Sequence, residues 1–277
     1  MNGGGPLPAC RQHDTTNRQG FTENLYVQGH LAFWDELRRR NPGLRIDSCA
    51  SGGRRNDLES MRRAVPLLRS DFQFPEMKDV VEGNQGHTYG LSSWLPFQGT
   101  GCYLYDSYSL RSFYLTSFGM GGLAPENLLA QKQAYAECRR LAPLMLGDYY
   151  PLTPYSRAPD RWIAWQFDRP DDGDGCVQAF RRRQCPDDRL TLRLQGLSPA
   201  LNYEVTDFDR PGSRIVSGRT LLTEGLTIVT PTQPGAAIIA YRLSTSAPPP
   251  PKRKRLTVTG SIPPTPHPLP EIPAPGQ

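Results

Sequence analysis

Apolar residues near the start of the chain recur at helical spacing. Val27, Leu31 and Trp34 lie three or four positions apart, which predicts one apolar face of a helix. The Asn-Pro-Gly sequence at 41–43 combines a helix-breaking proline with a turn-forming glycine, so we expect the helix to end before it. The segment 44–49 that follows, LRIDSC, predicts a short strand.

The alternation of helix and strand continues to about residue 150. Leu58, Met61 and Val65 predict a second helix with Asp57 as its N-cap, and residues 67–71 predict the next strand. The pattern also predicts a strand at 110–118 and a helix at 126–141. Strands separated by single helices are typical of parallel βαβ units.

From about residue 160 the pattern changes to short runs of β-branched and aromatic residues between turn clusters. No helical spacing separates these runs, so they predict an antiparallel β-sandwich. The six predicted strands are 161–167, 176–181, 189–194, 203–207, 226–230 and 237–242. The Asp- and Gly-rich stretch 171–175 predicts a hairpin turn, because it lacks the closing glutamate of a calcium loop.

These patterns together predict an α/β fold class with three parts. Residues 1–155 are expected to form part of a (β/α)8 TIM barrel, and residues 156–243 an antiparallel β-sandwich domain. Residues 244–277 hold 11 of the 28 prolines of the chain and almost no core-forming residues, which predicts a disordered tail.

Charge and hydropathy exclude several classes of function. The net charge is +5, but Lys252–Arg255 contributes four positive charges, so the rest of the chain does not favour a nucleic-acid partner. There is no run of eighteen apolar residues and no secretory signal, which predicts no membrane partner and favours the cytoplasm. Four scattered histidines and six cysteines without a Cys-x-x-Cys pair predict no metal site and no cofactor.

Two predicted strand ends carry polar residues that suit a small polar ligand. In parallel α/β barrels the functional residues stand at the carboxyl ends of the strands. One such end is Asp47-Ser48-Cys49, followed by Gly52-Gly53, and the other is Ser70-Asp71. From the residues alone, Asp71 could instead cap local amides. Trp94 could stack on a sugar from a barrel loop or could pack that loop down.

The same residues resemble a known signature. The run DSCASGGRRND at 47–57, followed by LRSD at 68–71, resembles glycoside hydrolase family 36, the α-galactosidases. WIAWQFDRP at 162–170 and YEVTD at 203–207 extend the resemblance, which covers residues 1–243. Many relatives have a third glycine where this chain has Arg54.

The resemblance implies a role for each matching residue. Asp71 would be the general acid/base of the reaction. Cys49, Ser51, Gly52 and Gly53 would lie against the bound galactose. The implied activity is retaining hydrolysis of terminal α-galactosyl residues, so the expected partner is a galactoside. A homo-oligomer is also compatible with the resemblance.

A retaining glycosidase needs a nucleophilic carboxylate opposite its acid/base. In the family this group belongs to a motif resembling Lys/Trp-x-Asp-Met-Asn on an earlier strand, whereas this chain begins Met1-Asn2. We therefore expect a C-terminal portion that lacks the nucleophile and the first half of the barrel, and that is inactive alone.

Three other interpretations remain open. The same carboxylates could serve an α-N-acetylgalactosaminidase or a galactosyl transferase. The chain could also be a non-catalytic carbohydrate-binding remnant or a pseudoenzyme subunit. A nucleic-acid-binding adaptor acting through the basic tail would instead show steeply salt-dependent affinity.

Overall fold

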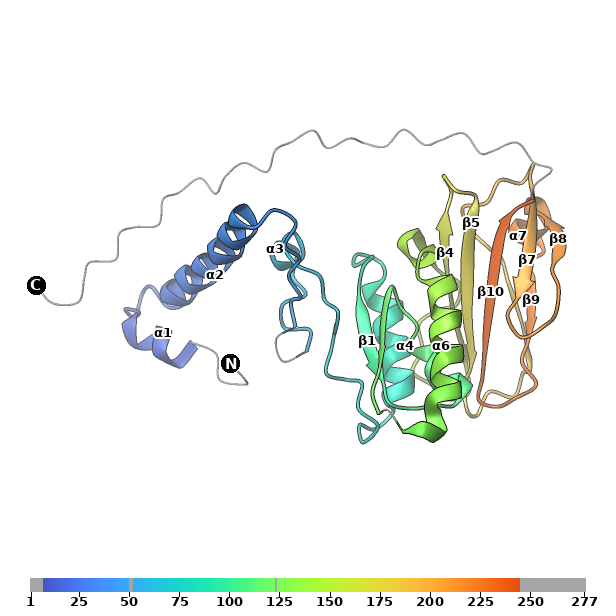
Figure 1. Cartoon of the computed structure of the whole chain (residues 1–277), viewed down its shortest axis with the longest axis horizontal. Helices are drawn as coiled ribbons and strands as arrows, with labels where there is room; N and C mark the ends of the chain where they lie inside the picture. The colour runs from blue at the N-terminus through green and yellow to red at the C-terminus, as the bar shows by residue number, and fades with distance from the viewer. Residues whose placement is uncertain (1–6, 50–51, 123, 245–277) are drawn as a thin grey trace, which may run out of the picture. The chain divides into compact units, whose positions relative to one another are not determined.

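The computed structural model describes residues 7–49, 52–122 and 124–244. Figure 1 shows the chain, whose described residues fall into two compact units, 7–45 and 46–244. Both sides of the expected domain boundary at 155/156 belong to the second unit. None of the helices in the described ranges combines the length and the apolar character that a membrane span requires. The predicted tail and Ser51 lie outside the described residues.

The first unit contains two helices, α1 (Leu7–His13) and α2 (Phe21–Arg40). Asp14 accepts hydrogen bonds from the backbone N–H groups of Gly20 and Thr22, at 2.6 and 2.9 Å, and so fixes the start of α2. The helix ends at residue 40, as the sequence predicts. Trp34 is its buried residue, whereas Val27 on the predicted apolar face is 46% exposed.

The second unit begins with helices and parallel strand segments. Its elements in this part are α3 (Leu58–Met61), α4 (Val80–Leu91), β1 (Gly99–Cys102), α5 (Ser107–Ser112), β2 (Ser117–Met120), a 3-10 turn (Pro125–Asn127), α6 (Leu128–Leu141) and a second 3-10 turn (Leu144–Leu146). β1 and β2 pair in parallel. Asp57 caps α3 by accepting from the Ser60 N–H at 2.9 Å, which confirms the predicted N-cap.

Three sequence predictions in this part are wrong in detail. The strand expected at 44–49 is reduced to a single parallel bridge between Asp47 and Val65. Residues 67–71 form no regular strand, although Arg69 bonds to the neighbouring strand β1. Most of the strand expected at 110–118 is helix α5 and the loop after it. The helix α5 is set by Asp106, whose carboxylate accepts from the Ser109 N–H at 2.9 Å.

The C-terminal part of the second unit is antiparallel. Its strands are β3 (Asp148–Pro151), β4 (Trp162–Arg169), β5 (Asp174–Arg181), β6 (Arg189–Leu192), β7 (Asn202–Asp207), β8 (Arg214–Ser217), β9 (Leu226–Val229) and β10 (Gly235–Leu243). Six strands form one sheet in the order β3-β4-β5-β10-β7-β8, and β6 pairs with β9. All six predicted strands are therefore present. The helix α7 (Gly218–Thr223) precedes β9.

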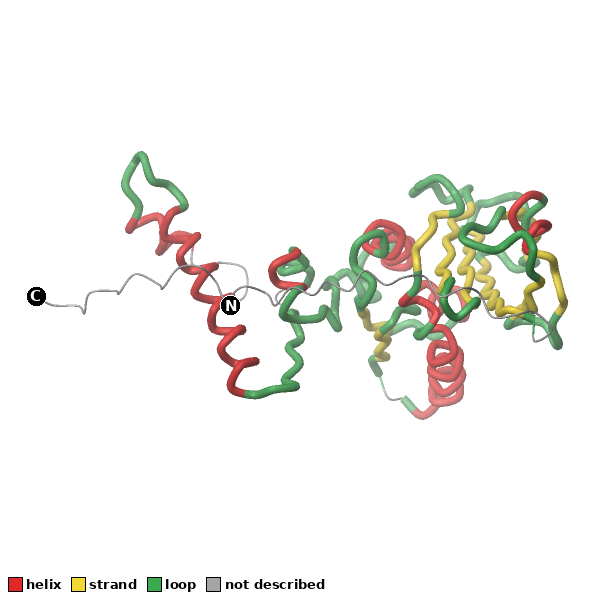
Figure 2. Tube along the Cα trace, turned by 90° about the horizontal axis from the view of Figure 1, so that it is seen from above, coloured by secondary structure: helices red, strands yellow, loops and turns green. Residues whose placement is uncertain are grey.

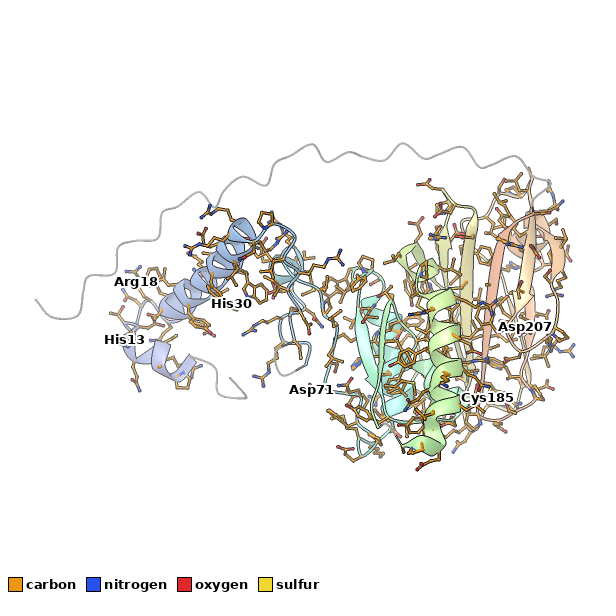
Figure 3. The ribbon with its side chains drawn as sticks, in the orientation of Figure 1. His13, Arg18, His30, Asp71, Cys185 and Asp207 are labelled. Carbon is orange, nitrogen blue, oxygen red and sulfur yellow. The ribbon has the colours of Figure 1, made fainter. Side chains whose placement is uncertain are left out.

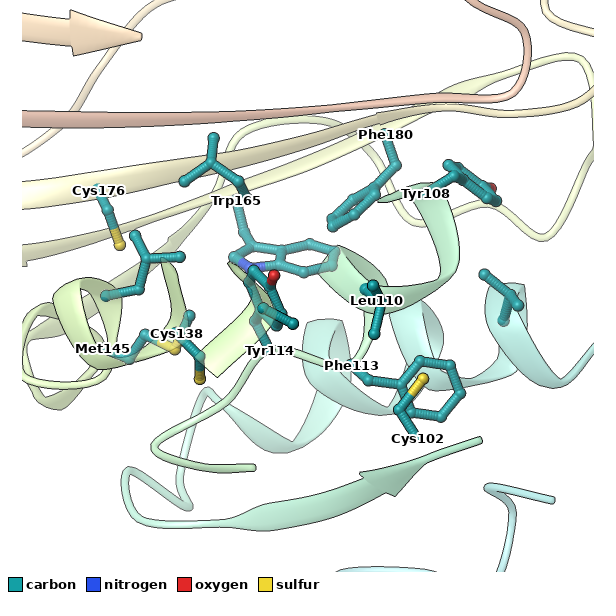
Figure 4. Packing of buried hydrophobic residues seen from close by; sticks show 14 of the residues in the cluster. Cys102, Tyr108, Leu110, Phe113, Tyr114, Cys138, Met145, Trp165, Cys176 and Phe180 are labelled. Carbon is teal, nitrogen blue, oxygen red and sulfur yellow. The ribbon is translucent and has the colours of Figure 1, made fainter. Parts of the chain in front are cut away.

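The central strands of the six-stranded sheet are buried on both faces because their side chains alternate between two cores. Trp165 and Phe180 point into a core shared with α5 and α6 (Figure 4). Ala164 and Ala179, one position away on the same strands, belong to a second core shared with β6, β9 and α7. Seen from above, α6 and α7 lie on opposite sides of the sheet (Figure 2). The second unit thus forms three layers, with this sheet in the middle.

Arg111 on α5 connects the parallel part to the sheet. Its guanidinium donates to Asp209 at 2.7 Å, to Glu137 on α6 at 2.9 Å, and to the Ala236 carbonyl of β10 at 2.9 Å. The Arg111 side chain is 6% exposed, so its guanidinium is largely shielded from water. It fixes the parallel part against the sheet.

Candidate active site

Parallel pairing brings several loops to one edge of the second unit. Val65 donates its N–H to the Ile46 carbonyl and accepts from the Ser48 N–H, both at 2.9 Å. The segment 65–69, which begins at Val65, contacts β1 on its other side, where the Arg69 N–H donates to the Gly99 carbonyl at 2.9 Å. Since β1 pairs in parallel with β2, the carboxyl ends of all these segments lie at the same edge.

The glycine loop lies directly against Asp71 at this edge. A Cβ atom placed on Gly52 would overlap the Asp71 backbone nitrogen and lie 2.9 Å from its Cγ. Gly52 also has a φ of +56°, a conformation that L side chains rarely adopt. Glycine is thus required at position 52 both for the backbone conformation and for the close approach. Figure 3 labels Asp71, which lies in the segment that runs from α3 to α4.

A second contact fastens the same loop. The Asn56 side chain donates through Nδ2 to the Arg69 carbonyl at 2.9 Å, and a Cβ atom on Gly53 would lie 2.6 Å from that carbonyl oxygen. Arg69 precedes Asp71 by two residues. The loop and the Asp71 segment are therefore held together at two points, on either side of Ser70.

The Arg69 side chain anchors the Asp71 segment from behind. Its guanidinium is buried and donates to Gln98 Oε1 at 2.8 Å, to Thr88 Oγ1 at 2.9 Å and to the Asn84 carbonyl at 3.0 Å. All three acceptors are neutral, so burial lowers the pKa of Arg69 to about 9. The hydrogen bonds tie the segment to helix α4 and to the residue before β1.

Gln73 connects the loop after Asp71 to the next strand. It is buried and its Oε1 accepts from the Gly101 N–H at 2.7 Å. Gly101 leads through Cys102 to Tyr103, whose ring contacts the ring of Phe74 with centroids 5.4 Å apart. The loop 71–74 and the end of β1 therefore form one connected edge.

Asp71 differs from the neighbouring carboxylates in having no structural task that the described residues reveal. Asp57 and Asp106 cap helices, and Asp47 accepts from the Leu67 N–H at 3.1 Å. Asp71 is exposed at the edge. The alternative in which Asp71 caps local amides has no hydrogen bond to support it in the described part of the chain. In the same ranges, no three His, Cys, Asp or Glu side chains come together as metal ligands would.

The structure brings some of the predicted site residues together and leaves others apart. Gly52 is buried against Asp71, and Cys49 is exposed at the end of the preceding segment. Trp94 is 41% exposed but lies between the end of α4 and the start of β1, at the amino end of that strand. The structure therefore does not bring Trp94 to the edge that holds Asp71.

Sequence reasoning missed Arg69, Gln73 and Tyr103. The partners of Arg69 lie 15 to 29 residues further along the chain, so no local pattern indicates them. Gln73 offers no signal beyond its position two residues after Asp71. Tyr103 offers no local signal either, because β1, the strand before it, reads Gly-Thr-Gly-Cys and has no apolar pattern that predicts a strand.

Known proteins are similar to this chain over parts of its length. Residues 162–241 match the model of the glycosyl hydrolase family 36 C-terminal domain. Probable alpha-galactosidase C of Aspergillus terreus is 25% identical over 235 residues, which cover 80% of this chain and 30% of that protein. The chain thus spans about a third of the length of this curated relative.

Solved structures show the same fold. The family 36 α-galactosidase AgaB from Geobacillus stearothermophilus is 22% identical, with a TM-score of 0.64 over 83% of this chain and 33% of that one. A variant of AgaA from the same organism, solved in complex with stachyose, is 20% identical, with a TM-score of 0.64 and the same coverage. Over residues 162–241 this chain therefore matches the C-terminal domain of glycosyl hydrolase family 36, and along most of its length it is similar to an α-galactosidase.

Proposed function

We propose that this chain supplies the acid/base side of an α-galactosidase active site. The parallel segments ending near Cys49, Asp71 and Tyr103 would form part of a (β/α)8 barrel, and their shared edge would be its catalytic face. The antiparallel part would be a β-sandwich domain that holds these segments in place through Arg111. The close approach of Gly52 to Asp71 carries the proposal, because it joins the glycine loop to an exposed carboxyl group.

The chemistry follows from that arrangement. Asp71 would protonate the glycosidic oxygen as the sugar leaves and would then take a proton from the attacking water. Cys49, Ser51, Gly52 and Gly53 would line the galactosyl ring. Backbone at Gly52 and Gly53 carries no side chain, so a sugar hydroxyl can approach its N–H and carbonyl groups closely.

Retention of configuration requires a second carboxylate about 5–5.5 Å from the first. Asp47, Asp57 and Asp106 each accept a backbone hydrogen bond that holds a loop or a helix start in place. We therefore include in the proposal a nucleophile from outside these 277 residues, so that the chain alone does not turn over a galactoside. A galactosyl oligosaccharide such as stachyose, found in the complex of the AgaA variant, would be the substrate of the completed site.

Two measurements test this proposal. The chain alone should release no nitrophenol from a nitrophenyl α-galactoside, and turnover that depends on Asp71 would show that it contains its own nucleophile. In amide NMR spectra, galactose should shift the signals of Gly52, Gly53 and Asp71. Asp71→Asn should weaken this response, because the carboxylate accepts hydrogen bonds from sugar hydroxyls.

Asp160→Asn is the matched control. Asp160 is exposed and lies before β4, where its carboxylate faces Arg161 at 3.6 Å. It should leave the galactose response unchanged. Shifts confined to other parts of the chain would contradict the assignment of the site. Galactose binding that ignores Asp71→Asn would instead favour a carbohydrate-binding remnant without catalytic function.

A further inference from the structure

Phe74 and Tyr103 form an aromatic pair next to Asp71. Their ring centroids are 5.4 Å apart with an angle of 35° between the ring planes. Tyr103 is 37% exposed. Among the described residues, the core between α5, α6 and the sheet includes Phe72, but it includes neither Phe74 nor Tyr103. The two rings thus pack on each other at the surface, outside that core.

The backbone around the pair fixes its position. A Cβ atom on Gly121 would overlap the Tyr103 ring, so the ring occupies the space beside the end of β2. The Gly121 N–H donates to the Cys102 carbonyl at 2.9 Å, and Tyr105 donates through its hydroxyl to the Gly122 carbonyl at 2.8 Å. Gln73 binds Gly101 and so fixes the other ring through the loop 71–74. The pair is therefore a preorganised surface.

The position of the pair relative to Asp71 indicates what it would contact. Phe74 follows Asp71 by three positions, and three residues span at most about 11 Å, on the order of the length of a disaccharide. A general acid lies beside the leaving oxygen, so groups beyond it meet the leaving group. The galactosyl ring would lie instead against the glycine loop around Gly52. Aromatic rings are typical of the apolar lining of small-molecule sites.

We propose that Phe74 and Tyr103 form a platform for the leaving-group sugar, and that they favour substrates whose leaving group is a pyranose. The C–H face of a pyranose ring is apolar and matches an exposed aromatic face, while its hydroxyl groups remain in water. This inference rests on the proposed role of Asp71. It adds a specificity for the leaving group that neither the glycine loop nor Asp71 provides.

The test compares galactose with stachyose on the full chain. Dissociation constants come from NMR titrations that follow the rings of Phe74 and Tyr103 and the amides of Gly52 and Asp71. We expect stachyose to shift both sets of signals and galactose to shift only the amides. Tyr103→Ala should weaken stachyose binding about tenfold, equivalent to ~1.4 kcal/mol, and leave galactose binding unchanged. Tyr103→Phe should retain the wild-type affinity.

Phe97→Ala is the matched control. Phe97 is 36% exposed, like Tyr103, but lies before the start of β1. It should change the affinity for neither sugar. An equal loss of stachyose affinity in Phe97→Ala and Tyr103→Ala would overturn the platform.

The remaining outcomes separate the platform from the proposed function. If galactose shifts Gly52 and Asp71 but stachyose binds no more tightly than galactose, the platform is wrong and the acid/base site stands. If stachyose shifts the rings while galactose shifts nothing, the platform stands as a sugar surface and the acid/base site fails. If neither sugar shifts any of these signals, both proposals are overturned.

Discussion

Replacing Gly52 by alanine tests the contact on which the candidate site depends. The new Cβ atom would overlap the backbone nitrogen of Asp71 and lie 2.9 Å from its Cγ. Because the nearest atom belongs to the backbone, no side-chain rotation can relieve the overlap. Either the glycine loop or the Asp71 segment must move.

Two costs add at this position. An alanine at a positive φ costs about 1–2 kcal/mol relative to glycine. Overpacking against fixed atoms costs about 1–3 kcal/mol more. We therefore expect Gly52→Ala to lower the free energy of unfolding by about 2–5 kcal/mol, measured by urea denaturation.

Gly212→Ala separates the two costs. Gly212 has a φ of +79° in the turn between β7 and β8, and a Cβ atom there would meet nothing within 4 Å. It should lose only about 1–2 kcal/mol, from the backbone conformation. Equal losses in the two variants would mean that the glycine loop does not approach Asp71. The geometric basis of the candidate site would then be lost.

Two further predictions concern stability. In urea titrations, Arg111→Met should lower the free energy of unfolding by about 2–3 kcal/mol. This is less than the ~3–5 kcal/mol expected for breaking a fully buried ion pair, because the Asp209 side chain is 48% exposed. The control Arg242→Met removes an exposed ion pair with Glu204 and should lower the free energy of unfolding by about 0–1 kcal/mol. Burial, with a smaller contribution from the charge of Arg69, lowers the pKa of His87 from 6.5 to about 4, so the unfolded chain binds the extra proton first. The free energy of unfolding should therefore fall as the pH decreases from about 6.5 to about 4. The variant His87→Gln should flatten that part of the curve of unfolding free energy against pH. If the variant gives the same curve as the wild type, His87 is protonated as readily in the folded chain as in the unfolded chain.

The antiparallel part could be predicted because local signals agree with the tertiary structure. β4 and β5 are joined by an Asp-Gly turn in which Gly173 has a φ of +70°, as a tight hairpin requires. The strands β3 and β8 were missed for a physical reason. They are the two edge strands of the sheet, and their residues are largely exposed or only partly buried. An edge strand therefore lacks the apolar pattern that reveals a central strand.

The helices α4 and α5 of the parallel part could not be predicted, because their local sequence signals do not match the structure. α5 was predicted as a strand because residues 108–115 are buried on every side, which removes the helical period. The sequence feature that does indicate a helix here is Asp106, a residue type that commonly caps helix N-termini. α4 was missed because it contains three glycines and buries Asn84, Gln85 and Thr88, so its buried face is polar. Two of these residues are buried because they accept hydrogen bonds from Arg69, a partner that no local pattern identifies.

The candidate site also has features that the sequence reveals and features that only the tertiary structure reveals. The glycine pair and the Ser-Asp pair could be found because their residue types are unusual at strand ends. What joins them is a backbone contact at Gly52, which exists only because the segments carrying the two pairs run in parallel. Arg69 holds the two segments in this alignment. Its carbonyl accepts a hydrogen bond from Asn56 in the glycine loop, while its guanidinium donates to helix α4. The position of Asp71 is thus set by tertiary contacts, and a sequence that kept both motifs but lost Arg69 would carry the same signature without the same geometry.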